Sequence, residues 1–279
     1  MSDVREVLRL RPGAAVDLAG HDPRATPAGP DSKSQAVAEL AGLGEELDAL
    51  QEALYAESRR RVLLVLQGMD TSGKGGVIRH VAGLVNPQGL HIASFKKPTE
   101  EERRHHFLWR VERQVPRPGL IGVFDRSHYE DVLVVRVDEL APEAQWRPRY
   151  AEITAFEDRL TADGVTILKC FLHISPQEQR ERLLARLDDP AKHWKYNPGD
   201  LVVRARWSRY QLAYEEVLHR CGTEAAPWYV IPADRKWYRN WAVATLLRDT
   251  LRDLRPTPPR PGFDVDAERD RLLRHDPLG

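Results

Sequence analysis

The stretch LLVLQGMDTSGKGGVIRH (residues 63–80) decides the fold of this chain. It opens with an apolar run, which is typical of a strand buried on both faces of a sheet. A glycine-rich loop and a helix-like segment follow. Gly68, four further residues, Gly73 and Lys74 match the phosphate-binding loop pattern, in the strand–loop–helix context that this pattern requires. We therefore predict a phosphate site at residues 68–76.

The glycines of this loop indicate how it would hold phosphate. They let the backbone bend and bring its N–H groups close to phosphate oxygens. The helix that begins near Lys74 adds its positive end, and Lys74 itself would reach the outer phosphates. The predicted binding residues of the loop are Gly68, Met69, Thr71, Ser72, Gly73, Gly75 and Gly76. A glycine-rich turn without a ligand is the alternative, and the match to the pattern disfavours it.

One position departs from the pattern. The pattern places Ser or Thr after the lysine, to hold Mg²⁺, whereas this chain has Gly75 and carries an acid, Asp70, inside the loop. A second acid, Asp125, ends the apolar run LIGVF, as a Walker-B acid does. We predict that Asp70 and Asp125 bind Mg²⁺, with Mn²⁺ as an alternative, because both metals prefer hard oxygen ligands. Asp125 as a simple helix cap is the competing interpretation, and the polar Arg126 beside it favours a site.

The rest of the chain alternates strands and helices, which predicts an α/β fold with a parallel five-stranded sheet flanked by helices. Predicted strands cover residues 62–67, 90–95, 119–125, 165–174 and 228–233. Predicted helices cover residues 34–57, 76–85, 100–115, 146–163, 176–187, 200–221 and 236–254. We expect an extended arm at residues 1–33, one P-loop domain at 34–255 with a lid at about 176–200, and a proline-rich tail at 256–279.

Composition excludes several classes of protein. The 279 residues carry 42 Lys and Arg against 42 Asp and Glu, so there is no overall basic charge of the kind a nucleic-acid-binding protein shows. No apolar stretch approaches the ~20 residues that span a bilayer, and the N-terminus lacks the apolar core of a signal peptide. With only two cysteines, one of them inside an apolar run, we expect a cytoplasmic protein without membrane partners.

Two basic segments would supply the cations that phosphoryl transfer needs. The segment at residues 176–195 carries Arg180, Arg182, Arg186, Lys192 and Lys195. Its acids also allow a plain solvated helix face, but its place after the fourth strand is where nucleotide kinases carry an arginine-bearing lid. Lys96 and Lys97 follow the second strand and would extend the positive surface along a long anion.

These motifs together resemble the second polyphosphate kinase family, P-loop enzymes that move phosphate between inorganic polyphosphate and nucleotides. The resemblance covers roughly residues 10–255. It rests on LQGMDTSGKGGVIRHVAGLVNPQG (66–89), SFKKPTEEE (94–102), HHFLWR (105–110), GLIGVFDRSHYEDVLVVRV (119–137), GVTILKCFLHISPQEQRERLLARLDDPAKHWK (164–195) and APWYVIPADRKWYRNWAV (226–243). It implies a P-loop kinase fold similar to that of thymidylate kinase, with a helical lid.

The resemblance also implies roles for individual residues. The predicted catalytic residues are Asp70, Lys74, Asp125, Arg126 and the lid arginines Arg182 and Arg186. The carboxylates would organise the metal, while Lys74 and Arg126 would stabilise the transferred phosphoryl group. The predicted substrate-binding residues outside the loop are Lys96, Lys97, His128, Glu130, Lys192 and Lys195.

Two residues that bear on acceptor specificity differ from the branch of the family that this chain resembles. The segments NPQG, FLWR and RSHYEDVLVVRV resemble the single-domain branch that acts on AMP and ADP. That branch often has Asn where this chain has Asp125, and an acid where this chain has His106. AMP, ADP or both therefore remain as acceptors.

The predicted function is Mg²⁺-dependent, reversible phosphate transfer between inorganic polyphosphate and adenine nucleotides, with guanine nucleotides as a second candidate. An ATP-dependent nucleoside or nucleotide kinase is the alternative from the same chemistry, although it would not need the cations at Lys96 and Lys97. A non-catalytic polyphosphate-binding protein is a third, disfavoured by the retained acids. The resemblance implies a homodimer or homotetramer, and the zero net charge predicts no nucleic-acid partner.

Overall fold

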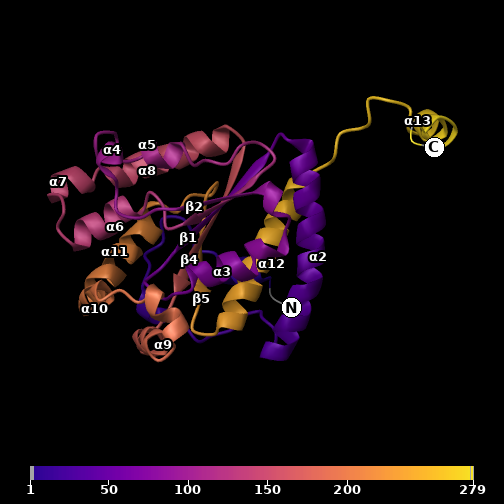
Figure 1. Cartoon of the computed structure of the whole chain (residues 1–279). Coiled ribbons are helices and arrows are strands. Elements are labelled where there is room, and N and C mark those ends of the chain that lie inside the picture. Colours follow the sequence, from indigo (N-terminus) through magenta and orange to yellow (C-terminus); the bar gives the residue numbers. More distant parts are fainter. Residues whose placement is uncertain (1–2, 277, 279) are drawn as a thin grey trace.

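A parallel sheet of five strands forms the centre of the computed structural model, which describes residues 3–276 and 278. Its strands are β1 (Arg61–Gln67), β2 (Leu90–Ser94), β3 (Ile121–Asp125), β4 (Val165–His173) and β5 (Trp228–Pro232), in the order β2-β3-β1-β4-β5. Every pair of neighbours is parallel (Figure 1). The predicted strands and sheet are confirmed. Since β1 lies in the middle, the loop that follows it starts at the centre of the sheet edge.

Helices cover both faces of this sheet (Figure 1). Their bounds are α1 (Val4–Leu8), α2 (Lys33–Glu57), α3 (Lys74–His80), α4 (Glu100–Arg103), α5 (Trp109–Glu112), α6 (Glu130–Val137), α7 (Glu143–Trp146), α8 (Arg149–Ala162), α9 (Pro176–Leu187), α10 (Gly199–Ala205), α11 (Trp207–Arg220), α12 (Lys236–Leu254) and α13 (Val265–Arg274). Short 3-10 turns lie at Leu18–Gly20, Ala82–Leu84, Pro87–Gly89 and Pro190–Lys195.

Two hydrophobic cores hold the layers together. Successive side chains of β1 point to opposite faces, so Leu63 and Val65 join the core under α6, α8 and α11, while Leu64 and Leu66 join the core under α2, α3 and α12. All four side chains are fully buried. The near-continuous apolar run in the sequence follows from burial on both faces.

Several helical segments differ from the prediction, including α13, which lies in the expected proline-rich tail. The helix expected at residues 100–115 is two short helices, α4 and α5, because the buried Arg110 donates to Lys96 O (2.8 Å) and tertiary contacts decide the path. The helix expected at 200–221 is interrupted at Arg206. Helix α6 (Glu130–Val137) was not predicted, since its valines lower intrinsic helix propensity and burial in the core outweighs that effect.

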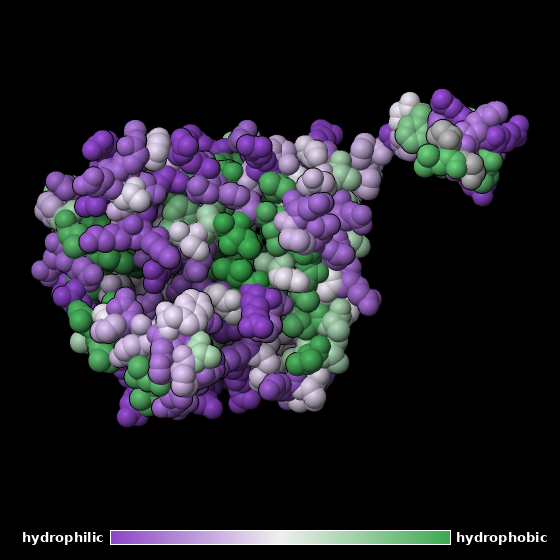
Figure 2. All heavy atoms as spheres, in the orientation of Figure 1, coloured by the Kyte–Doolittle hydropathy of each residue, from purple (hydrophilic) through white to green (hydrophobic). Residues whose placement is uncertain are grey.

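The two ends of the chain behave differently. The N-terminal arm lies against the body: Leu10 N donates to Trp228 O (2.8 Å), Asp234 N donates to Pro23 O (3.0 Å), and Leu18 is buried. After α12 the chain leaves the body, and α13 lies apart from it with every described residue exposed (Figure 1). Figure 2 shows a mostly hydrophilic surface with a group of hydrophobic residues near the middle of the face in view. Among the described residues, no helix combines the length and the apolar character needed to cross a bilayer.

Candidate active site

The phosphate-loop motif forms a tight loop between β1 and α3, as its strand–loop–helix context requires. The φ angles of Gly68 (147°) and Gly73 (110°) lie in a region that L side chains rarely adopt, and Thr71 also has a positive φ of 64°. Space is restricted as well, because a Cβ atom on Gly68 would lie 2.6 Å from Leu172 O. The glycines at both ends of the motif therefore serve the backbone path of the loop.

Lys74 lies inside this loop and is buried. Its Nζ donates to Gly68 O (2.7 Å) and Met69 O (3.3 Å). Burial lowers the pKa of Lys74 and the charge of Arg126 lowers it further, while Asp70, Asp125 and Glu130 oppose that effect. Three carboxylates and one guanidinium thus act electrostatically on a single ammonium group, so the structure brings these predicted residues together.

Asp70 and Arg126 form the closest ion pair of the site. Arg126 Nη2 lies 2.7 Å from Asp70 Oδ1 and joins the loop after β1 to the loop after β3. Burial alone raises the pKa of Asp70, but Lys74 and Arg126 outweigh burial, so the pKa lies below its ordinary value. Arg126 has a positive φ of 65°, and its N–H donates to Leu66 O (3.0 Å), which fixes the turn after β3. The aspartate is therefore held in its ionised form.

Asp125 and Glu130 are the other two carboxylates that act on Lys74. Asp125 is the last residue of β3, level with Leu66 on β1 and Ser94 on β2. Glu130 begins α6, where its Oε1 accepts a hydrogen bond from Gln67 Nε2 (3.1 Å) at the end of β1. Burial raises the pKa of Glu130, although Arg126 and the bond from Gln67 counteract it. Asp125 and Glu130 thus flank the loop from neighbouring elements.

The chemistry of these donors fits a hard divalent cation. No cluster of three or more His, Cys, Asp or Glu side chains suited to a metal ion occurs within the described part of the chain. Two aspartates are nevertheless the ligand set that Mg²⁺ commonly uses when substrate phosphates and water supply its remaining ligands. Asp70 also stays ionised, as a ligand must. The assignment of a metal to Asp70 and Asp125 stays a prediction.

The lid predicted at about residues 176–200 covers α9 and the turn Pro190–Lys195 and ends at the start of α10. Arg186 lies 3.5 Å from Asp200 and donates to Lys195 O (2.8 Å), and its charge contributes to the low pKa of Asp70. Lys192 pairs with Asp189 (2.6 Å), and the Lys195 Nζ lies 4.9 Å from the centre of the Trp194 ring. Arg186 is therefore the lid arginine that acts on the loop electrostatically.

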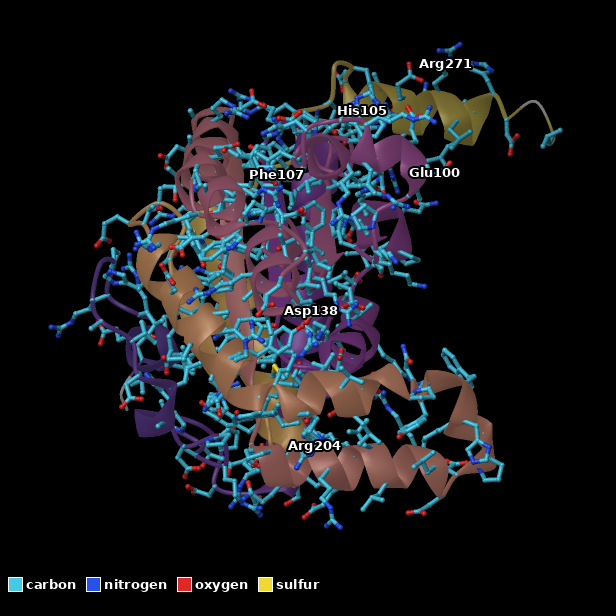
Figure 3. All side chains as sticks on the ribbon, turned by 90° about the vertical axis from the view of Figure 1, so that its left-hand side faces the viewer. Glu100, His105, Phe107, Asp138, Arg204 and Arg271 are labelled. Carbon is cyan, nitrogen blue, oxygen red and sulfur yellow. The ribbon has the colours of Figure 1, made fainter. Side chains whose placement is uncertain are left out.

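Figure 3 shows where α10, which follows the predicted lid, lies relative to the segment after β2. Its lower part carries Arg204 on α10, and its upper part carries His105 and Phe107 on that segment. Arg204 Nη1 donates to Pro176 O (2.7 Å) and Gln179 Oε1 (2.9 Å), so it ties the end of α10 to the start of α9. Exposed Lys96 and Lys97 line a cavity of about 390 Å³ beside β2. Phe95 N donates to Asp125 O (3.0 Å), which connects this cavity wall to the end of β3.

Two of the predicted site residues are buried and contact other parts of the protein. Arg182 is buried, and its donors end on the carbonyls of Thr71, Ser72, Ala233 and Asp234. His128 is also buried, with Nε2 3.1 Å from Glu157 in the core. The structure thus places both side chains behind the loops of the site, and the catalytic role of Arg182 and the binding role of His128 stay predictions.

Sequence reasoning missed two residues that hold the loop. Gln179 Nε2 donates to Asp70 O (3.0 Å), and Arg239 Nη1 donates to Ser72 O (3.3 Å). Both come from far along the chain, on α9 and α12, and neither spacing nor residue type links them to the loop. The only available signal was that both fall within the segments that carry the family resemblance.

Known proteins are similar to this chain over most of its length. Residues 31–257 match the family model described as polyphosphate kinase 2. A curated protein of Meiothermus ruber, an AMP/ADP-polyphosphate phosphotransferase, is 51% identical over 253 residues, which are 91% of this chain and 95% of that protein. An ADP-polyphosphate phosphotransferase of Rhodopseudomonas palustris is 43% identical over 82% of this chain and 83% of its own length.

Solved structures agree with the sequence matches. The crystal structure of polyphosphate kinase 2 from Arthrobacter aurescens superposes with a TM-score of 0.94 at 49% identity, covering 98% of this chain and 97% of that one. A polyphosphate kinase 2 structure from Pseudomonas aeruginosa gives a TM-score of 0.76 at 31% identity, over 90% of this chain and 51% of its own. The predicted P-loop kinase fold is thereby confirmed.

Proposed function

This chain belongs to the polyphosphate kinase 2 family, and we propose that it transfers phosphate between inorganic polyphosphate and adenine nucleotides, accepting both AMP and ADP. One observation carries the proposal: Lys74 lies in a phosphate loop under the influence of Asp70, Asp125, Glu130 and Arg126. Such a set suits phosphoryl transfer, in which catalysis is mostly positioning and neutralisation of charge. The names of the relatives support the choice of substrates.

In the proposed reaction, the phosphate loop holds the end of polyphosphate and a phosphate oxygen of the nucleotide attacks its terminal phosphorus in line. No covalent enzyme intermediate is needed, and the acceptor is already anionic, so a strong general base is not required. Lys74 and Arg126 stabilise charge on the transferred group, and Arg186 adds charge from the lid. Asp70 and Asp125 would hold Mg²⁺, which neutralises phosphate charge when bound.

The polyphosphate chain would extend from the loop along the exposed lysines. Lys96 and Lys97 beside β2, with Lys192 and Lys195 on the lid, offer positive charge to a long anion. The direction of transfer would follow the concentrations of polymer, diphosphate and triphosphate, because the bonds exchanged are all phosphoanhydrides. We propose adenine nucleotides as the preferred acceptors, with guanine nucleotides as the second candidate.

An ATP-dependent nucleoside or nucleotide kinase is not favoured. Curated relatives that cover most of this chain carry names of polyphosphate phosphotransferases. A passive polyphosphate-binding protein would have no need for ionised Asp70 beside Lys74 and Arg126. We also propose that the protein is a cytoplasmic homodimer or homotetramer that has no nucleic-acid partner.

The donor is the feature to test. Purified protein is incubated with ADP and either long-chain polyphosphate or no polymer, each with Mg²⁺, with Mn²⁺ or with excess chelator. We expect ATP only when polyphosphate and a divalent cation are both present. ATP formation that continues in excess chelator would contradict the metal assignment. If the protein phosphorylates nucleosides from ATP and makes nothing from polyphosphate, the kinase alternative replaces the proposal.

A further inference from the structure

Two buried guanidinium groups support the phosphate loop from the side of its carbonyl oxygens. Arg182 on α9 donates through Nη1 to Thr71 O (2.8 Å) and Ser72 O (3.1 Å). Arg239 on α12 donates through Nη1 to the same Ser72 O (3.3 Å). Arg239 is the more buried of the two, with 3% of its surface exposed. Side chains from two helices, α9 and α12, thus donate to the same carbonyl oxygen of the loop, Ser72 O.

The loop is shaped to receive Arg239. A Cβ atom on Gly73 would lie 1.7 Å from Arg239 Nη1, and one on Gly76 would lie 2.6 Å from Arg239 Nη2. A Cβ atom on Gly75, between them on the same turn, would meet nothing within 4 Å. The absence of side chains at residues 73 and 76 therefore has a packing reason beyond backbone freedom, since it leaves room for this guanidinium.

Among the described residues, no carboxylate forms an ion pair with Arg239. Arg182 Nε pairs with Glu178 (2.7 Å), whereas Arg239 donates to the neutral Asn240 Oδ1 (3.2 and 2.9 Å). Burial lowers the pKa of Arg239 and the charge of Arg182 lowers it further, while the charge of Glu178 opposes both effects. A buried charge is costly unless an opposite charge balances it. A phosphate chain on the loop would supply that opposite charge.

We propose that Arg239 is a positioning residue for the phosphate loop, which orients a loop N–H group and strengthens the binding of polyphosphate. This inference rests on the proposed function. A peptide unit is planar and trans, so its C=O and N–H groups point in opposite directions. Holding Ser72 O on the guanidinium therefore turns the N–H of Gly73 away from Arg239, and the buried positive charge adds to the attraction for the polyanion.

Substitution of Arg239 tests the proposal through the Michaelis constants. We expect Arg239→Met to raise KM for polyphosphate about tenfold, as loss of a charge-assisted hydrogen bond predicts, and to change KM for AMP less than about twofold. Arg239→Lys keeps the charge and should recover part of the loss. Arg252→Met is the matched control, since Arg252 lies on the same helix and pairs with Glu46 at the surface. Thermal melting shows whether each variant folds.

A double-mutant cycle with Arg239→Lys keeps the proposal testable if Arg239→Met is unstable. Gly76→Ala directs a methyl group at Arg239 and Gly75→Ala directs one into open space, so only the former should be coupled to residue 239. We expect Gly76→Ala to raise KM for polyphosphate less in the Arg239→Lys background than in the wild type, and Gly75→Ala to have the same effect in both backgrounds. Unaltered KM for polyphosphate in Arg239→Met, or equal coupling of both alanines, would overturn the inference while the wild type still transfers phosphate. Absence of transfer in the wild type would overturn the proposed function instead.

Discussion

At the scale of single residues, the site depends on which charges the fold keeps close to Lys74. The two acids named from the motifs, Asp70 and Asp125, both act on it, and so does Glu130. Arg126 joins Asp70 across the gap between two strand ends. The electrostatic balance of the site is therefore a property of four or five side chains together, which is why single substitutions should have large effects.

Lys74→Met and Asp125→Ala should each lower kcat for phosphate transfer by about a hundredfold or more, as removal of a preorganised charge does in other enzymes. Product formation from polyphosphate and ADP measures this. The matched controls are Lys33→Met and Asp31→Ala, at exposed positions near the start of α2. A folded Lys74→Met or Asp125→Ala protein with full activity would refute the site assignment.

Glu130→Gln should change how stability depends on pH. The folded state raises the pKa of Glu130 above its ordinary value of about 4.3. At pH values between the ordinary pKa and the raised pKa, the folded state holds a proton that the unfolded state has lost. The stability of the wild type therefore falls as pH rises through this window. Gln cannot titrate, and this fall should be absent from the variant.

The measurement is the melting temperature of wild type and Glu130→Gln between pH 4 and 8. We expect the melting temperature of the variant to rise relative to that of the wild type as pH increases, until the pH exceeds the pKa of Glu130 in the folded state. Asp70 works in the opposite sense, because its lowered pKa gives stability that is lost as pH falls through that value. A difference between Glu130→Gln and wild type that stays constant over the whole range would contradict the raised pKa.

At the scale of elements, a buried ionic network connects α8, β4 and the loop after β3. Lys169 Nζ lies 2.5 Å from Glu157 Oε2 and donates to Tyr129 Oη (3.0 Å), and Glu157 also contacts His128. Lys169 and Glu157 are almost fully buried. This network explains why His128 supports the site from the core, since it ties the segment that follows Arg126 to the sheet.

Glu157→Gln should destabilise the fold by ~3–5 kcal/mol, because it leaves the buried Lys169 without its counter-charge. The same change at Glu143, whose exposed side chain pairs with Arg147 on the surface, should cost less than ~1 kcal/mol. Urea unfolding of the two variants gives both values. Equal, small losses in both would show that the buried pair contributes no more than a surface pair.

Elements also show where sequence reasoning succeeds and fails. The strands were predictable because burial on both faces leaves long apolar runs, as in β1, and the loop was predictable because phosphate binding demands glycines at fixed spacing. Helix α6 was missed because its valines favour strands. Arg239 was missed, and the carbonyl partners of Arg182 were not foreseen, because these contacts join residues 51 to 167 positions apart and no local pattern encodes them.

At the scale of the whole molecule, the folded body and the tail separate cleanly. The family match ends at residue 257, and α13 lies apart from the body with exposed side chains (Figure 1). Residues that contact nothing in the body add little to its stability. The N-terminal arm is the contrary case, since Leu18 is buried in the core and Tyr238 Oη donates to Pro27 O (2.8 Å).

Deletion of residues 258–279 should therefore change the free energy of unfolding by less than ~0.5 kcal/mol and leave phosphate transfer intact. Deletion of residues 1–22 should destabilise the protein by several times that amount, because it removes the buried Leu18 and Leu8. Urea unfolding of both truncated proteins compares the two ends directly. A large loss from the C-terminal deletion would show that the tail contributes to the folded body.

Phosphate transfer to AMP and ADP, offered separately with long-chain polyphosphate and Mg²⁺, tests the central claim most directly. Chromatography resolves the products of wild type and of Lys74→Met. We predict that the wild type makes ADP and then ATP from AMP, and ATP from ADP, while Lys74→Met makes almost none of either. Clean folding of the wild type without product from either nucleotide would contradict the account.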